Sequence, residues 1–219
     1  MTTPHLSSLL REVEAQGWGL LEACPETARP DQLAKRLELA GLRCHTATAM
    51  QVLSPRTDAA STYPSLSARY GLASFPAHVD GAHRPIPPRY VLLYCTIDEQ
   101  ARPTRLYPWH ALEYTARVEA QLSREVFAYR SGARSMLDSV LDRSRAFVRL
   151  DPGCMIPRTR QGESLLASIA SAIGSAEAVD VNWEPGRAAL IDNWRTLHGR
   201  GVARADGRRE IVRYTFDIP

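Results

Sequence analysis

The sequence predicts an α+β fold that is mainly β, with a barrel or sandwich of short strands as its core and helices beside it. Short apolar runs rich in β-branched and aromatic residues fill the second half of the chain, where turn residues separate them. Few helical patterns interrupt these runs, which argues against a doubly wound sheet. The 219 residues suit a single domain, 1–219, that is long enough to bury a proper core.

The first 50 residues are expected to form a helical support for that core. Apolar residues at helical spacing predict a helix over 6–16, and the run at 18–21 predicts a short strand. Pro30 opens a second predicted helix over 32–40. We therefore divide the domain into a support, 1–50, and a β-rich core that carries the active site, 51–219.

The core is expected to consist mainly of strands. They share β-prone composition and flanking turn residues, and they lie at 50–53, 89–97, 104–107, 126–129, 135–141, 146–150, 179–183, 187–192 and 211–218. Two helices are predicted among them, one from Pro108 to Leu122 and one over 162–173. Residues 54–72 are rich in Ser, Thr, Pro, Ala and Arg, which predicts a long loop of the functional or mobile kind.

Composition limits the partners of the protein. The formal net charge of +3 is too small to argue for nucleic acid or an anionic membrane as a partner. No apolar run approaches the length of a membrane span, and the start of the chain does not resemble a signal peptide. The four cysteines are widely spaced and are expected to be reduced thiols of a cytoplasmic protein. A homo-oligomer is left open.

His78 and Asp80 form an H-X-D triplet of the kind that chelates a metal ion. In a strand, alternate side chains share a face, so these two would point together while Val79 packs behind them. A distant His198 would complete a facial triad of two histidines and one carboxylate, which leaves three coordination positions open on Fe(II) for a cosubstrate and O₂. The triplet alone is a weak signal, because a histidine in an apolar segment is more often a core residue than a ligand.

The surroundings of these residues strengthen the metal hypothesis. The block Phe-Pro-Ala-His-Val-Asp-Gly at 75–81 and the block that runs from Pro-Gly-Arg to Leu-His-Gly-Arg at 185–200 resemble the Fe(II)/2-oxoglutarate-dependent dioxygenases. The similarity is to the branch that holds taurine dioxygenase and clavaminate synthase, it continues at 208–213, and it covers roughly 50–219. The resemblance implies a double-stranded β-helix (jelly-roll) core with flanking helices, Fe(II) as the metal, and 2-oxoglutarate and O₂ as cosubstrates.

Site residues carry over from the resemblance. His78, Asp80 and His198 would bind Fe(II), and Arg209, eleven positions after His198, would hold the distal carboxylate of 2-oxoglutarate. A planar and permanently charged guanidinium suits that carboxylate on physical grounds as well. Thr104 resembles the hydroxyl that shares the carboxylate in the family.

A second arginine leaves one assignment open. Arg213 lies four residues beyond Arg209 and therefore on the same face of a strand. In the taurine branch an arginine at this place meets the substrate anion, while in other branches the cosubstrate arginine lies nearer to it. We favour Arg209 for 2-oxoglutarate and leave an exchange of the two roles open.

The reaction implied by the resemblance is hydroxylation of an unactivated C–H bond, with 2-oxoglutarate converted to succinate and CO₂. The substrate is expected to be a small, anionic or amino-acid-like metabolite, and desaturation or cyclisation stays open. The chain is short for this branch, so the site either admits a bulky or carrier-bound substrate or is covered by a neighbouring subunit. The alternatives are a cupin-type metal-dependent isomerase and a non-catalytic metal-binding protein on a related barrel.

Overall fold

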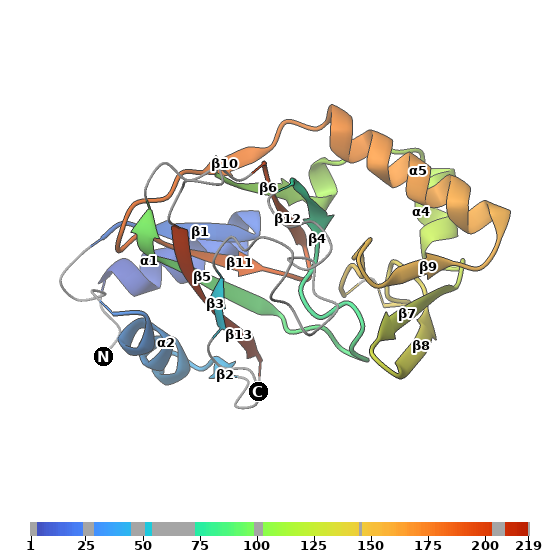
Figure 1. Cartoon of the computed structure of the whole chain (residues 1–219). Helices are drawn as coiled ribbons and strands as arrows, with labels where there is room; N and C mark the ends of the chain where they lie inside the picture. Colours follow the sequence, from blue (N-terminus) through green and yellow to red (C-terminus); the bar gives the residue numbers. More distant parts are fainter. Residues whose placement is uncertain are drawn as a thin grey trace.

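A computed structural model describes residues 4–23, 29–44, 51–53, 73–98, 103–144, 146–202 and 209–218 of the protein. Strands dominate it, as the sequence predicts, and helices flank them (Figure 1). The elements in chain order are α1 Pro4–Gln16, β1 Trp18–Leu21, α2 Pro30–Leu39, β2 Arg43–Cys44, β3 Gln51–Leu53, β4 Phe75–His78, β5 Tyr90–Asp98, β6 Thr104–Pro108, the 3-10 helix η4 Trp109–Ala111, α4 Ala116–Leu122, β7 Phe127–Ser131, β8 Arg134–Asp138, β9 Met155–Pro157, α5 Arg160–Ser175, β10 Val179–Val181, β11 Ala188–Asp192, β12 Thr196–Arg200 and β13 Arg209–Asp217.

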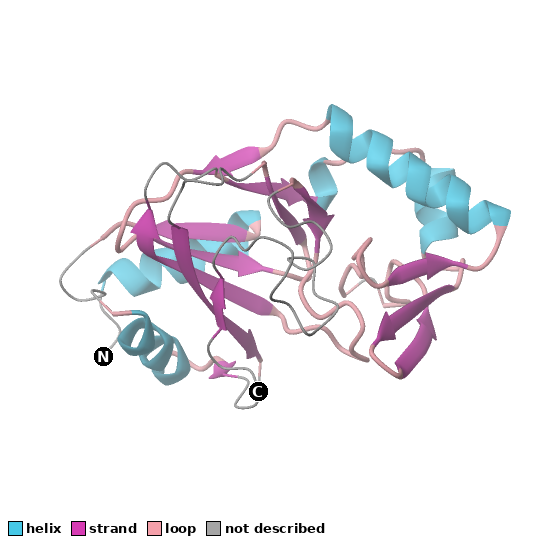
Figure 2. Cartoon of the chain, viewed as in Figure 1, coloured by secondary structure: helices cyan, strands magenta, loops and turns pink. Residues whose placement is uncertain are grey.

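The strands form three antiparallel sheets (Figure 2). The largest has the order β1-β11-β5-β13-β2, with β3 also paired to β13, and the second has the order β10-β6-β12-β4. The third is a small sheet of β8, β7 and β9. The N-terminal support therefore contributes β1 and β2 to the largest sheet as well as two helices.

Helices α1 and α2 cover the outer face of the largest sheet. Leu6, Leu9 and Val13 recur at helical spacing on α1 and are buried, and they share an apolar cluster with Leu92 of β5 and Leu190 of β11. Each such buried leucine contributes about 1.5–3 kcal/mol through removal of apolar surface from water. The amphipathic pattern of the N-terminus thus fixes which face of the sheet is closed by helices.

The inner faces of the two larger sheets enclose a second apolar cluster. Leu93 of β5, Ile211 of β13 and Leu106 of β6 are buried together there. Because side chains alternate along a strand, the residues two positions from these also face the interior. That rule directs Arg209, Arg213 and Thr104 inward, and His198, which lies opposite Leu106, joins them.

The third cluster joins α4, α5 and the small sheet to the outer side of β4 and β12. Phe127 and Tyr129 of β7 are fully buried against Leu165 and Ile169 of α5, and Leu197 of β12 belongs to the same cluster. This unit lies at the far end of the molecule from α1 and α2 (Figure 1). It therefore packs against the outer side of the two strands that carry His78 and His198.

One local expectation for the H-X-D triplet is wrong. β4 ends at His78, and Asp80 lies in the turn that follows rather than in the strand. Gly81 has a φ of +70°, and Val79 donates its backbone N–H to the carbonyl of Leu150 instead of to a sheet neighbour. Asp80 consequently reaches the site from a turn, although it ends beside His78 as predicted.

Two other expectations need correction. The helix predicted from Pro108 to Leu122 is divided into η4 and α4, because Thr115 is extended and caps the second helix through its hydroxyl. The segment at 146–150 does not form a strand with a continuous partner. Among the described residues it makes one isolated bridge, between Val148 and Leu141.

Other expectations hold or fall outside the described part. The strand predicted over 135–141 is present as β8, while β2, β9 and β12 were not recognised as separate strands. The predicted loop at 54–72 lies outside the described residues. Among the helices that the structure describes, none has the length and apolar character needed to cross a membrane.

Candidate metal centre

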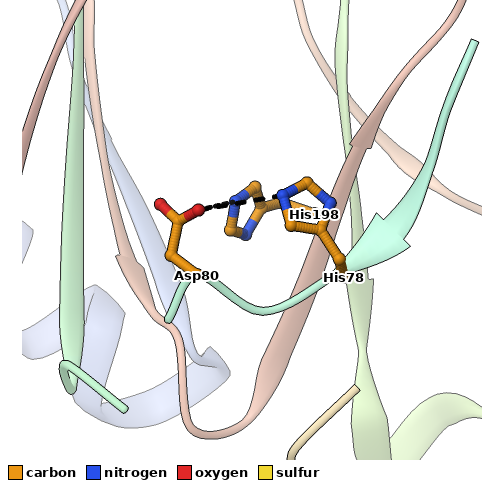
Figure 3. A group of neighbouring side chains, drawn as sticks. All are labelled: His78, Asp80 and His198. Atoms are coloured by element: carbon orange, nitrogen blue, oxygen red, sulfur yellow. Dashed lines mark ion pairs between the residues drawn. The ribbon is translucent and has the colours of Figure 1, made fainter. Parts of the chain in front are cut away.

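His78, Asp80 and His198 converge on one point inside the molecule (Figure 3). Each offers a ligand atom within 4.8 Å of the others, and all three residues are buried. Oδ1 of Asp80 lies 3.8 Å from Nε2 of His78 and 3.9 Å from Nε2 of His198. The three side chains that the sequence singled out are therefore brought together by the fold.

Neighbouring strands position the two imidazoles. β4 and β12 pair side by side, and His78 lies directly opposite His198 in their register. Directly opposed residues in an antiparallel pair have Cβ atoms about 5 Å apart, so their side chains meet. The two ring centroids are 4.5 Å apart.

Both imidazoles turn one ring nitrogen toward the common point. Nδ1 of His78 lies 3.0 Å from the carbonyl oxygen of Pro76 and donates to it, so Nε2 is the ring nitrogen that faces Asp80. Burial first, and then the charges of His78 and Arg213, lower the pKa of His198 to about 3, against the opposing effect of Asp80. The His198 ring is therefore uncharged at neutral pH.

Asp80 is held as a carboxylate despite its burial. Burial alone would raise its pKa, but the charges of Arg213, His198 and His78 outweigh it and lower the pKa to about 2. Nη1 of Arg213 donates to Oδ1 at 2.6 Å. Within the described part of the chain, Oδ2 has no hydrogen-bond partner although it is buried.

These features fit a divalent transition metal. Two neutral imidazole nitrogens and a carboxylate oxygen on one side of an ion are the donor set of the facial triad. A buried carboxylate oxygen without a partner and a second carboxylate oxygen that faces two nitrogen lone pairs are both satisfied by a cation. The residues present therefore fit Fe(II).

The structure places the two candidate arginines differently. Arg213 contacts Asp80, and its other nitrogen donates to Oε1 of Gln51. Arg209 lies four residues back along β13, and burial followed by the charge of Arg200 lowers its pKa to about 10. Arg213 thus contacts a member of the metal triad, whereas Arg209 lies near the guanidinium of Arg200.

Thr104 lies with Arg200 rather than with the triad. It is buried, it pairs with Arg200 in the register of β6 and β12, and its hydroxyl accepts a hydrogen bond of 3.0 Å from Nε1 of Trp183. Two positions along β12 separate Arg200 from His198, which is about 7 Å in a strand. Thr104, Arg200 and Arg209 therefore define a basic end of the interior beside the metal site.

Arg200 was not assigned a role from the sequence. The signal that identifies it is its spacing of two from His198, which puts both side chains on one face once β12 is known to be a strand. Its guanidinium lies over the ring of Phe75, 4.1 Å from the centroid, and donates to the carbonyl of Ala73.

Comparison with protein families supports the recognition made from the motifs. Residues 121–215 match the family described as Taurine catabolism dioxygenase TauD, TfdA family. The matched segment is less than half of the chain and contains His198, Arg209 and Arg213. The resemblance to the taurine dioxygenase family is confirmed by this match. The curated protein sequences gave no match.

Solved structures share the fold at low identity. An asparagine oxygenase in complex with Fe(II), (2S,3S)-3-hydroxyasparagine and succinate has a TM-score of 0.74 and 19% identity, over 97% of this chain and 77% of that one. The non-haem iron oxygenase OrfP, in complex with Fe and α-ketoglutaric acid, has a TM-score of 0.71 and 18% identity, over 99% and 80%. The PvcB protein from Pseudomonas aeruginosa has a TM-score of 0.70 and 17% identity, over 96% and 79%.

Proposed function

We propose that this protein is a non-haem Fe(II)- and 2-oxoglutarate-dependent oxygenase that hydroxylates a C–H bond of a small, amino-acid-like metabolite. The observation that carries the proposal is the buried convergence of His78, Asp80 and His198 with ligand atoms within 4.8 Å of one another. The family match and the neighbouring oxygenases that hold Fe, 2-oxoglutarate or succinate support it. They do not favour a cupin-type isomerase or a non-catalytic protein.

We also propose a specific architecture for the β-rich core. Two antiparallel sheets that face each other across the metal site support a double-stranded β-helix (jelly-roll) core at 51–219, with 1–50 as its support, in one domain. The paired strands β4 and β12 hold the two histidines on rigid elements, which suits a site that must keep its geometry through several steps.

The residues divide into two groups by what they would hold. His78, Asp80 and His198 bind Fe(II), and Arg209 with Thr104 binds the distal carboxylate of 2-oxoglutarate. Both residues lie at the basic end of the interior near Arg200, which is two residues from His198 on β12, and this place supports the assignment. Arg213 contacts Asp80 and provides positive charge at the triad, where it suits the carboxylate of an amino-acid-like substrate.

The chemistry depends on how these residues are prepared. Bound Fe(II), together with 2-oxoglutarate and O₂, supplies the oxidant for the C–H bond, while 2-oxoglutarate becomes succinate and CO₂. The neutral imidazole of His198 presents a lone pair without losing a proton first, His78 turns its Nε2 to the same point, and Asp80 provides one negative charge. The buried walls around them exclude water and strengthen the interaction of the arginines with carboxylates.

Turnover with a panel of substrates tests the proposal. The purified protein is incubated in air with Fe(II), 2-oxoglutarate and free L-amino acids that include asparagine and arginine, and succinate and oxygenated product are quantified. We expect succinate in step with product for at least one substrate, and a loss of at least about 100-fold in H78A, D80A and H198A, because the triad holds the metal as a unit.

An exposed histidine provides the matched control. His110 lies in η4, away from the triad residues, so H110A should retain wild-type turnover. Full activity in any of the three triad variants, or succinate formation that H110A removes as strongly as they do, would contradict the ligand assignment.

A further inference from the structure

The turn that carries Asp80 is fixed by side chains rather than by a sheet. Residues 80–88 follow the end of β4 and contain no strand or helix. Their carbonyl groups are bound from behind by three side chains of other segments: Asn193 binds those of Asp80 and Pro88, Trp194 that of Pro87, and Arg149 those of Ala82, Arg84 and Pro85. Of these, only Asn193 acts on the residue that provides the metal ligand.

Asn193 holds both backbone groups of Asp80. Its Oδ1 accepts the Asp80 N–H at 2.8 Å, and its Nδ2 donates to the Asp80 carbonyl at 3.0 Å and to the Pro88 carbonyl at 2.8 Å. Asn193 has 0% of its surface exposed, so water does not compete for these bonds. An asparagine amide has one acceptor oxygen and two donor hydrogens, and all three functions are used here.

The segment that presents Asn193 is itself rigid. Asn193 lies in the turn between β11 and β12, and its own N–H donates to the carbonyl of Arg89 at 2.7 Å. The preceding Asp192 is fully buried, accepts the Trp194 N–H at 3.1 Å and binds Nε of Arg195 at 2.9 Å. The amide of Asn193 is therefore a fixed reference point for Asp80.

We propose that Asn193 is a positioning residue that sets Asp80 in its ligating position before the metal binds. His198 lies five residues after Asn193 on β12, so one hairpin presents the third ligand directly and places the carboxylate ligand through Asn193. His78 is placed by the pairing of β4 with the same β12. This inference rests on the proposed metal site and explains how ligands far apart in sequence come to share one geometry.

Metal affinity in the absence of turnover is the direct test. Metal-free protein is titrated anaerobically with Mn(II) by calorimetry for wild type, N193A and N193D. N193D keeps the side-chain size and the acceptor oxygen Oδ1. It replaces the donor group Nδ2 with a carboxylate oxygen that faces the carbonyl oxygens of Asp80 and Pro88. We expect the dissociation constant for Mn(II) to rise about 10- to 100-fold in both variants, as for other residues that orient metal ligands.

W194F is the matched control. It removes one hydrogen bond to the same turn, from Nε1 to the Pro87 carbonyl at 2.9 Å, without touching Asp80. We expect it to lower the urea midpoint while the Mn(II) dissociation constant stays within about threefold of wild type. If the two Asn193 variants also bind Mn(II) within threefold of wild type, Asn193 is structural only and the proposal fails.

A measurement on the wild-type protein keeps the proposal testable if both variants misfold. Hydrogen exchange of the Asp80 amide is followed in metal-free protein, where we expect its protection to equal that of β12 amides both before and after Mn(II) is added. Fast exchange that slows only when Mn(II) is added would overturn the proposal. Wild-type protein that binds no Mn(II) would instead defeat the metal site itself, which distinguishes the two failures.

Discussion

Asp80 is a buried carboxylate that a neighbouring guanidinium, Arg213, keeps ionised and ready for a cation. Its Oδ1 faces two imidazole nitrogens at 3.8 and 3.9 Å and also accepts from Arg213 at 2.6 Å. Removal of a carboxylate from water is costly unless nearby groups compensate it. The same arrangement keeps Asp80 ionised and His198 neutral, which are the states in which these two residues bind a metal.

The protonation of His198 makes the metal-free protein sensitive to acid. Its pKa is about 3 in the fold, against about 6.5 in an unfolded chain, so between these values the unfolded state binds one more proton. The free energy of unfolding is therefore highest above pH 6.5 and falls as pH decreases, by up to about 1.4 kcal/mol per pH unit from this group. Urea unfolding is measured from pH 7 to 4 in wild type and H198Q. The free energy of unfolding should depend less steeply on pH in H198Q, by the contribution of about one bound proton. An identical slope in the two proteins would contradict the lowered pKa.

The two arginines on β13 are distinguished by which ligand they affect. R209A should raise the KM for 2-oxoglutarate about 10- to 100-fold, because a charge-assisted hydrogen bond contributes about 1.5–3 kcal/mol. R213A should change that KM far less and instead raise the KM for the amino-acid-like substrate. Steady-state kinetics with each substrate varied in turn measures both effects. The opposite pattern would show that the roles are exchanged.

At the scale of single residues, the sequence was sufficient to single out the three side chains that converge and insufficient to identify the residues that position them. His78 and Asp80 are recognisable by a spacing of two, and His198 by its motif. Asn193 and Asp80 are 113 positions apart, so their contact depends on the register of strands that the sequence did not specify. Arg200 was missed for the same reason, because β12 was not recognised as a strand.

At the scale of elements, the close approach of β4 and β12 determines the distance between the two histidines. A Cβ on Gly199 would lie 3.0 Å from the carbonyl oxygen of Phe75 and 3.3 Å from the backbone nitrogen of Ala77. Both contacts are with the backbone of β4, which cannot yield as a flexible side chain would. A glycine next to His198 therefore lets the strands approach closely enough for the imidazoles to meet.

Substitution of Gly199 should consequently affect both stability and metal binding. G199A is expected to lower the free energy of unfolding by about 1–3 kcal/mol through overpacking and to weaken Mn(II) binding by moving His198. G174A in α5 is the control, since no described residue outside its own helix turn lies within 4 Å of the added Cβ and alanine is favoured in helices by about 0.5–1 kcal/mol. Urea unfolding and calorimetry measure the pair. Equal metal affinity in G199A and wild type would contradict the packing argument.

Helices and strands were predictable where a pattern of apolar residues continued over many positions. Helix α1, helix α5 and strand β5 agree with expectation because each carries a sustained apolar pattern. The segment at 146–150 has the composition of a strand but no partner ladder; Val148 instead donates to the carbonyl of Trp194. Strand composition alone does not establish that a neighbouring strand is available.

At the scale of the whole molecule, Arg149 connects the small sheet to the turn beyond Asp80. Its guanidinium has no exposed surface, binds three carbonyl groups of that turn and forms an ion pair of 3.1 Å with Asp138. It also lies over the rings of Tyr129 and Phe147, at 5.5 and 5.1 Å. Arg149 thereby links the small sheet to the turn that follows Asp80 through direct hydrogen bonds and an ion pair.

Loss of Arg149 should be costly for the whole fold. R149M is expected to lower the free energy of unfolding by about 3–5 kcal/mol, because it leaves buried carbonyl groups without donors. D138N removes only the partly exposed partner, whose side chain is 43% accessible, and should cost less than about 1 kcal/mol. Chemical denaturation of the two variants gives the comparison. A loss of less than 1 kcal/mol in R149M would contradict this role.

This chain covers only part of the length of its structural neighbours. Solved structures are covered over 77–80% of their chains while almost all of this chain is used. The expectation of an open or subunit-covered site therefore stays a prediction. The overall class of fold was predictable because strand-rich composition and the two motifs agree, whereas the pairing order of the sheets required the structure.

The central claim is that His78, Asp80 and His198 share one iron. Crystals soaked anaerobically with Fe(II) and 2-oxoglutarate, with diffraction recorded at the iron absorption edge, test it most directly. We predict one anomalous peak bounded by Nε2 of both histidines and a carboxylate oxygen of Asp80, with 2-oxoglutarate reaching Arg209. A peak bound by other residues, or no peak in crystals that diffract well, would contradict it.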